Sequence, residues 1–210
     1  MSRPEGTTTR LLLVRHGEVD PRWRGTIYGR LDVPLSERGL EQSEMVAAAL
    51  EGEPLEAVIS SGLQRAEAAA ALIRATRPGL ERVDDPGLLE LDRGEWAGRA
   101  IRDLERESPE LMAAWRASRG AMAAPGGEEP EALAGRVRGA LARIAAAHPG
   151  RTVAVVAHLW VVRSALTACL GLSMSQSGRL GLPPGGICEL EWPSSGSAAG
   201  GFPRLLAMGR

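Results

Sequence analysis

The sequence predicts an α/β fold in which helices cover both faces of a mostly parallel sheet, giving a three-layer α/β/α sandwich. Three short apolar runs carry this prediction, namely residues 11–14, 57–59 and 153–157. Uninterrupted aliphatic runs of this length are typical of strands that are buried on both faces, as in parallel sheets. Segments with helical features separate the three runs, as expected when parallel strands are connected through helices.

Two helices are expected in the first half of the chain, over residues 37–50 and 63–74. Ser36 can cap the first of them, because its hydroxyl can accept a hydrogen bond from a free backbone N–H of the first turn. The second helix is rich in alanine and carries Arg65 in its first turn. The residues of the first helix expected to face the core are Leu40, Val46 and Leu50.

Three further helical regions are expected in the second half of the chain. Residues 99–124 divide into two short helices at Pro109, a longer helix begins near Pro130, and the last helix follows His158. Proline is favourable in the first turn of a helix, where its missing N–H would have had no partner. The long helix ends at His148, which we expect to cap its last carbonyl groups.

Two more strands should complete the sheet. Residues 187–192 alternate between apolar and polar side chains, which indicates a strand with one exposed face. Residues 205–208 predict a last short strand, and the tract 194–201 is expected to be a flexible turn between the two. No second domain can be separated, so residues 1–210 are predicted to form a single domain.

Composition excludes several classes of function. The 25 basic residues, all of them arginine, nearly balance 26 acidic residues, so no basic face for nucleic acid is expected. Cys169 and Cys188 have neither metal-ligand spacing nor the density of a disulfide scaffold. A location of the protein in the reducing cytoplasm is therefore expected. Residues 1–10 are polar and unlike a signal peptide, and no apolar run is long enough to cross a membrane.

Two of the three histidines follow predicted buried strands directly. His16 stands between Arg15 and Gly17 after the first apolar run, and His158 ends the run 153–157. Ligands of open parallel sheets bind at the carboxyl ends of the strands, so these groups should converge with Arg65 if the strands are neighbours. Guanidinium groups can hold an anion while a ring nitrogen attacks it. For each residue alone, a satisfied polar group at a strand end is the simpler interpretation.

An arginine-rich loop follows His16. It contains Arg22 and Tyr28, the one tyrosine of the chain. A solvated charged loop is the simplest interpretation of such a run. A loop that leaves the end of a strand beside a binding site is also a common source of substrate contacts. Both side chains are therefore candidate substrate-binding residues.

Six blocks of the chain form an ordered pattern, with residues 12–18, 29–36, 60–66, 89–98 and 125–128 followed by His158 with Arg163. In this order and at these intervals they resemble the histidine phosphatase superfamily, also called the phosphoglycerate mutase-like family. The Arg-His-Gly triplet alone is a weak signal, whereas six ordered blocks are a strong one. The resemblance implies a phosphoglycerate mutase-like fold and a metal-independent phosphomonoesterase that needs no cofactor.

The resemblance also assigns roles to the strand-end residues. It makes His16 the nucleophile, which would form a phosphohistidine during the reaction. Arg15, Arg65 and His158 would hold the phosphate oxygens. The expected partner is a small phosphorylated metabolite. A homodimer is left open, and neither nucleic acid nor a membrane is expected.

Glu90 is nominated by the resemblance as the proton donor to the leaving alcohol, in preference to Asp92 or Glu95. A departing alkoxide needs a proton, and a carboxyl beside a phosphate dianion has a raised pKa, whereas nearby arginines act in the opposite direction. The sequence therefore leaves the protonation state of Glu90 open. The resemblance also places residues 99–124 over the site as a partial lid, although an ordinary pair of surface helices is the alternative.

Departures from the family pattern bear on the substrate. Val19 and Arg22 stand where the family often has Thr and Asn, and Glu129 stands where Ser is common. Leu159 and Trp160 replace the glycine that commonly follows the second histidine. Leu159 should narrow the pocket above the phosphate and favour esters with an apolar or ring-bearing leaving group. The Trp160 side chain can lie either in the core or in the wall of the pocket, and the sequence does not distinguish the two positions.

The sequence is compatible with three hypotheses for the function. The leading one is a phosphatase, and residues 18–19 and 28–35 weakly resemble the α-ribazole phosphatases. A cofactor-dependent phosphoglycerate mutase is the alternative enzyme, but residues 91–93 are Leu-Asp-Arg where mutases carry Arg-His-Tyr. A non-catalytic protein that binds a phosphorylated ligand is the third. The presence of Glu90 argues against it, because a binding protein has no need of the acid.

Overall fold

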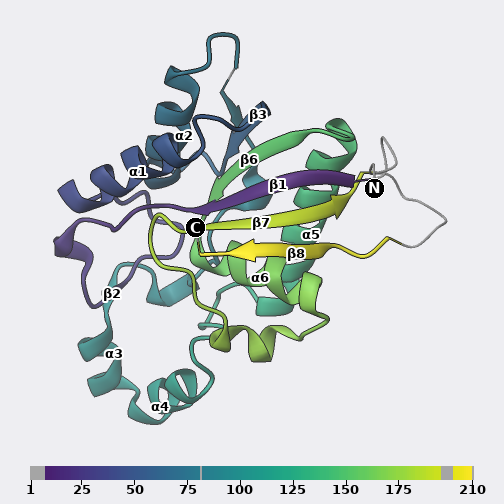
Figure 1. The fold of residues 1–210 in the computed structure, drawn as a ribbon. Coiled ribbons are helices and arrows are strands. Elements are labelled where there is room, and N and C mark those ends of the chain that lie inside the picture. Colours follow the sequence, from purple (N-terminus) through teal and green to yellow (C-terminus); the bar gives the residue numbers. More distant parts are fainter. Residues whose placement is uncertain (1–7, 81, 195–200, 210) are drawn as a thin grey trace.

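The computed structural model describes residues 8–80, 82–194 and 201–209, whose arrangement is shown in Figure 1. A six-stranded sheet with the order β4-β3-β6-β1-β7-β8 forms the centre. The first four of these strands are parallel, whereas β7 and β8 pair antiparallel with their neighbours. The strands are β1 (Thr8–Arg15), β3 (Leu55–Ser60), β4 (Val83–Asp84), β6 (Thr152–Ala157), β7 (Ile187–Pro193) and β8 (Arg204–Met208).

The register of the parallel strands brings the two histidines to one edge of the sheet. Arg15 of β1 lies opposite Ala157 of β6, so the residues that follow them, His16 and His158, emerge side by side. β3 pairs with the other side of β6 and ends at the same edge with Ser60. The predicted neighbourhood of the three apolar strands is therefore confirmed.

Alternate residues of β1 face two different helical layers. Leu12 and Val14 pack in a core cluster with residues of α1 and α2, whereas Leu11 and Leu13 pack with residues of α5 and α6. Figure 1 shows the two pairs of helices on opposite sides of the sheet, which confirms the three-layer sandwich. The helices are α1 (Glu37–Ala49), α2 (Gln64–Ala75), α5 (Pro130–Ala147) and α6 (Leu159–Leu170).

The first turn of α1 packs tightly against the loop that carries His16. The Ser36 hydroxyl accepts the backbone N–H of Gly39 at 3.0 Å, as the cap predicted from the sequence requires. A Cβ atom on Gly17 would come within 2.2 Å of the carbonyl oxygen of Gly39. Glycine at position 17 therefore lets the chain leave β1 in direct contact with α1.

Residues 99–124 form a smaller unit beside the sheet, next to β2 in Figure 1. α4 begins at Pro109, as predicted, and a third apolar cluster joins Leu104 and Met112 to Ile27 of β2. The elements of this unit are β2 (Thr26–Ile27), β5 (Arg99–Ala100), α3 (Ile101–Glu107) and α4 (Pro109–Ala117). Short 3-10 helices elsewhere are η1 (Pro21–Trp23), η2 (Pro86–Leu88), η3 (Gly94–Trp96) and η4 (Met174–Arg179).

Two expectations about exposure are wrong. Leu40 does not face the core but is 48% exposed, whereas Val46 and Leu50 are buried as predicted. β7 alternates as expected, yet its polar face is buried as well. The reason is that Glu189 and Glu191 form ion pairs with arginine side chains from the strands on either side, Arg10 of β1 and Arg204 of β8.

Carbonyl groups at the end of α5 accept hydrogen bonds from a hydroxyl group of β1. Thr9 Oγ1 of β1 lies 2.8 Å from the carbonyl oxygens of both Ala145 and His148. At the same helix end, the backbone N–H of His148 donates to the carbonyl oxygen of Ala145. The predicted turn over residues 194–201 falls almost entirely outside the described residues. Among the described residues, no helix is both long enough and apolar enough to span a membrane.

Candidate active site

His16 follows the last residue of β1 and is almost completely buried. Its Nδ1 lies 2.7 Å from the carbonyl oxygen of Gly17. A carbonyl oxygen can only accept a hydrogen bond, so Nδ1 carries the ring proton. The other ring nitrogen, Nε2, therefore keeps its lone pair and can act as a nucleophile.

The surroundings of His16 keep its imidazole neutral. Burial lowers the pKa of His16 from 6.5 to about 3, and the positive charges of Arg65 and Arg15 act in the same direction. At neutral pH, a proton therefore does not compete for the lone pair on Nε2. A site filled with positive charge thus contains an uncharged nucleophile.

His158 packs edge to face on His16, with 5.1 Å between the ring centroids. Burial holds the pKa of His158 well below its usual value, and the neighbouring His16 imidazole and the charge of Arg65 act in the same direction. The Ser61 hydroxyl lies 2.8 Å from Nε2, and Nδ1 is buried with no partner among the described residues. When Ser61 donates to Nε2, the proton on Nδ1 is available to an incoming acceptor.

Arg15 and Arg65 are buried and held by backbone carbonyl groups. The two terminal nitrogens of Arg65 donate to Leu31 and Gly29 at 2.7 Å each, and Arg15 donates to Leu182. The Nε of each arginine is buried and has no partner in the described parts of the chain. Buried donors without acceptors are costly, and an anion between them would satisfy both.

Glu90 supplies a carboxyl group that tends to keep its proton. Burial raises the pKa of Glu90, against the opposing effects of the Leu91 backbone N–H and of the charges of Arg93 and Arg65. The Leu91 N–H donates to Oε1 of this carboxyl at 2.7 Å. Burial is the largest of these effects, so the pKa of Glu90 is shifted in the direction that a general acid requires.

One cavity of about 180 Å³ brings most of the predicted residues together, and it is lined by Arg15, His16, Tyr28, Glu90 and Leu159, among others. Arg65 and His158 lie directly behind its wall. The Arg65 guanidinium stands 5.3 Å from the centre of the Tyr28 ring, and His158 contacts His16. Trp160 also lines the cavity, although it is 6% exposed, so both interpretations of this residue hold in part.

Arg22 is not brought to this cavity. Its side chain is 77% exposed and pairs with Asp20 at 3.0 Å. It lines a separate surface hollow together with Trp23 and Pro34. The solvated-loop interpretation therefore describes Arg22 better than a contact in the cavity with His16.

The structure adds Arg93, which the sequence did not nominate. It lines the same cavity, is 6% exposed, and its guanidinium carbon lies 5.0 Å from the ring centre of Trp160. Trp115 of α4 lines the cavity as well, 5.9 Å from that guanidinium. The departure at residues 91–93 was visible in the sequence, but no pattern there indicated that three distant segments meet at Arg93.

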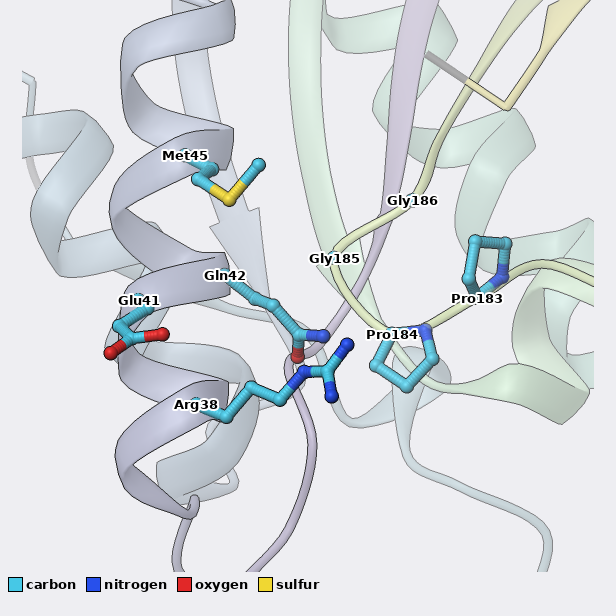
Figure 2. A pocket seen from close by; sticks show the side chains of 8 residues that line it. All are labelled: Arg38, Glu41, Gln42, Met45, Pro183, Pro184, Gly185 and Gly186. Carbon is cyan, nitrogen blue, oxygen red and sulfur yellow. The ribbon is translucent and has the colours of Figure 1, made fainter.

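A loop before β7 holds Arg15 in place. Gly185 donates to the carbonyl of Arg15, and the N–H of Arg15 donates to Gly186, both at 3.0 Å. The outer side of this loop borders an open hollow, where Figure 2 shows Arg38 and Gln42 of α1 reaching toward Pro184 and Gly185. None of the sequence-predicted site residues lines this hollow. Its wall contributes to the site only through the backbone hydrogen bonds of Gly185 and Gly186 to Arg15.

The described part of the chain has no group of three or more His, Cys, Asp or Glu side chains that could hold a metal ion. The cavity combines a neutral imidazole, donors for an anion and a carboxyl group whose pKa is raised by burial. These groups can bind an anionic substrate, attack it through nitrogen and protonate the group that leaves. The fold and site thus define an α/β enzyme equipped for group transfer from an anionic substrate.

Comparison with known proteins gives this enzyme a family. Residues 11–200 match the model of the histidine phosphatase superfamily (branch 1), so the chain belongs to that family. It is 36% identical to the metal-independent phosphoserine phosphatase of Arabidopsis thaliana over 163 residues, covering 76% of this chain and 68% of the relative. It is 31% identical to the adenosylcobalamin/alpha-ribazole phosphatase of Escherichia coli over 163 residues, with coverages of 78% and 80%.

A solved structure has the same fold. The mycobacterial glucosyl-3-phosphoglycerate phosphatase superposes with a TM-score of 0.77 at 28% identity, covering 88% of this chain and 90% of that one. The predicted fold class and the family resemblance are both confirmed. The relatives differ in the substrates that their names give, so the substrate of this chain has to be argued from its own residues.

Proposed function

We propose that this phosphatase hydrolyses the phosphate monoester of a small metabolite through a phosphohistidine on His16, without a metal ion. The family and the phosphatase relatives support hydrolysis of a phosphoric ester. The name of the Arabidopsis relative supports metal independence. The observation that carries the proposal is the hydrogen bond of His16 Nδ1, which leaves Nε2 unprotonated. Nearby are two arginines whose Nε atoms have no partner among the described residues.

In the first step, the lone pair of His16 Nε2 attacks phosphorus and the ester P–O bond breaks. Arg15 and Arg65 neutralise the charge on the phosphoryl oxygens, and His158 donates through Nδ1. The carboxyl proton of Glu90 passes to the departing oxygen, so the product leaves as an alcohol. The phosphoryl group is then bonded to His16, and Glu90 is a carboxylate.

In the second step, water attacks phosphorus and the P–N bond breaks. Glu90 accepts a proton from the attacking water, which restores its acid form. His16 recovers its lone pair, and inorganic phosphate leaves. Every group therefore returns to its starting state after one turnover.

The size and walls of the cavity support a small leaving group. A volume of about 180 Å³ is below the range of pockets that enclose drug-sized ligands, which fits a small substrate. Leu159 lines the cavity with an apolar side chain, and Ile101 and Trp115 of the α3–α4 unit line it as well. We propose that this unit acts as a partial lid, since it would lie over the leaving group and keep water from it during the first step.

Turnover of p-nitrophenyl phosphate in the presence of EDTA tests this proposal. We expect the same rate with and without the chelator, because imidazole and guanidinium groups perform the roles that a metal would have. Two variants provide the comparison, His16→Ala in the cavity and Arg22→Ala at an exposed arginine outside it. Activity should disappear in the first and persist in the second. Loss of activity in EDTA that added Mg²⁺ or Zn²⁺ restores would contradict metal independence.

A further inference from the structure

Glu90 lies in a stretch without helix or strand, between η2 and η3. Its position is therefore not fixed by the hydrogen bonds of a helix or sheet, and side chains from two distant segments hold it instead. Nη1 of Arg136 donates to the carbonyl oxygen of Leu89 at 3.0 Å, and Nε of Arg30 donates to the carbonyl oxygen of Glu90 at 3.0 Å. Each of the two peptide groups that flank the Cα atom of Glu90 is thus bound by a guanidinium group.

One carboxylate binds both of these arginines. Nε and Nη2 of Arg136 donate to the two oxygens of Glu128 at 2.9 and 2.8 Å, the forked geometry in which guanidinium and carboxylate groups bind each other most strongly. Nη2 of Arg30 donates to Oε2 of Glu128 at 3.1 Å. The Glu128 side chain is only 12% exposed, so it is shielded from water between the two arginines. Glu128 therefore sets the direction in which both guanidinium groups point.

Glu128 is held in its ionised form. Burial acts to raise its pKa, but the hydrogen bonds and charge of Arg136, together with the charge of Arg30, lower the pKa below its usual value. Arg30 has a second carboxylate, Asp92, at 3.3 Å. Among the described residues, the recorded ion pair of Arg136 is with Glu128 alone. Loss of the Glu128 charge should therefore release Arg136 most, and with it the carbonyl of Leu89.

Glu128, Arg30 and Arg136 all lie outside the lining of the active-site cavity. We propose that Glu128 is a positioning residue, which acts through Arg30 and Arg136 to hold the Glu90 carboxyl within reach of the departing oxygen. A general acid has to lie within hydrogen-bond distance of the atom that it protonates, and a displacement of about 1 Å can cost on the order of 10²-fold in rate. This inference rests on the proposed function, because it concerns the proton transfer that Glu90 makes in that reaction.

The test measures the first step for benzyl phosphate and p-nitrophenyl phosphate, as release of the alcohol or phenol in a single turnover. Benzyl alcohol needs a proton to leave, whereas p-nitrophenolate leaves without much protonation. In Glu128→Gln, which keeps the shape of the side chain without its charge, we expect the rate for benzyl phosphate to fall about 10- to 100-fold. The rate for p-nitrophenyl phosphate should stay within a few-fold of wild type. The KM of both esters should change little, because Arg15 and Arg65 still bind the phosphate.

A double variant shows whether Glu128 acts through Glu90. If it does, Glu128→Gln adds little further loss for benzyl phosphate in a protein that already carries Glu90→Gln. The full loss repeated in the double variant would overturn the inference, because Glu128 would then act by another route.

Arg136→Lys tests the same network without changing Glu128. It keeps the positive charge that acts on His158, but lysine lacks the planar fork that binds Glu128 and the Leu89 carbonyl together. This variant should show the same selective loss for benzyl phosphate. The inference therefore stays testable even if Glu128→Gln fails to fold.

Glu53→Gln is the matched control. The Glu53 carboxylate also accepts two N–H groups of a single arginine, Arg10, and its side chain is 18% exposed. Arg10 lies near the start of β1, at the opposite end of the strand from His16, and Glu53 does not line the cavity. The ratio of the two rates in this variant should equal that of the wild type.

The outcomes separate this inference from the function on which it rests. Equal losses for both esters in Glu128→Gln would overturn the positioning role, because the network would then only support the fold. A selective loss in Glu90→Gln without one in Glu128→Gln would also overturn it and leave the proposed function intact. No selective loss in Glu90→Gln would contradict the proposed function of the acid and this inference with it.

Discussion

In the proposed mechanism, His16 has to be uncharged to attack phosphorus, yet the phosphate has to be held by positive charge. The site meets both demands through the same two arginines. Burial lowers the pKa of His16, and the charges of Arg65 and Arg15 add to this effect. The Nε atoms of both arginines have no partner among the described residues and can bind an anion. The hydrogen bond from Nδ1 to Gly17 then determines which ring nitrogen is free to react.

Glu90→Gln should separate two kinds of substrate. An alkyl phosphate needs a proton on its leaving oxygen, so we expect kcat to fall about 10²- to 10⁴-fold. The p-nitrophenolate ion leaves without much protonation, so the first step for that ester should slow far less, as measured by the release of colour in a single turnover. The control is Glu95→Gln, because Glu95 is exposed and lies outside the cavity. Equal losses for the two esters would rule out Glu90 as the acid.

At the scale of elements, the start of α6 sets the shape of the cavity. Leu159 is the first residue of this helix and lines the cavity directly after His158. Leu159→Gly should therefore widen the space above the phosphate. We expect higher turnover of compact esters with a second phosphate, and weaker action on aryl phosphates, which lose apolar contact. Leu159→Ala serves as the intermediate control. A substrate profile unchanged in steady-state kinetics would contradict a role of Leu159 in selection.

The elements that the sequence predicted best are those whose residues carry a strong local pattern. β1, β3 and β6 appeared as apolar runs, and the histidines at their ends located the site. The exposure of β7 could not be predicted, because it depends on Arg10 and Arg204, which come from two other strands. Residues near the ends of strands are placed by the sheet, whereas side chains on its flanks are placed by tertiary contacts.

Arg93 belongs to the second group. Its position depends on the approach of Trp115 from α4 and of Trp160 from α6. These residues are separated by tens of positions in the chain, and no periodicity relates them. Ser61 was not predicted as a site residue for a similar reason, because its hydrogen bond to His158 depends on the register between β3 and β6. The sequence therefore predicts the candidate reacting groups but not the groups that surround and orient them.

At the scale of the whole molecule, the buried histidines link folding to pH. The pKa of His16 is about 3 in the folded protein and 6.5 in the reference state, and that of His158 is also lowered. The unfolded chain therefore binds more protons between pH 6.5 and 3, so stability falls as the pH falls through this range. The raised pKa of Glu90 has the opposite effect above pH 4.5, where it lowers stability as the pH rises.

His16→Gln isolates one part of this linkage. Between pH 7.5 and pH 5, the free energy of unfolding of the variant should fall by on the order of 2 kcal/mol less than that of the wild type. The reason is that the unfolded wild type gains a proton on His16 below its reference pKa of 6.5, over about 1.5 pH units, whereas the variant has no such group. Urea denaturation at the two pH values measures the difference. His158→Gln and the double variant complete the comparison, because His16 lowers the pKa of His158 and the two contributions are coupled. The same loss of stability in both proteins would show that His16 is protonated equally in the folded and unfolded states.

The central claim is that the phosphoryl group passes through His16, and rapid quenching tests it most directly. The wild-type protein is mixed with a phosphate monoester, quenched in base within one turnover, digested and analysed by mass spectrometry. We expect phosphate on the peptide that contains His16, stable in base and lost in acid, and no phosphate on the peptide with His158. Absence of this adduct, together with continued turnover by His16→Ala, would contradict the account.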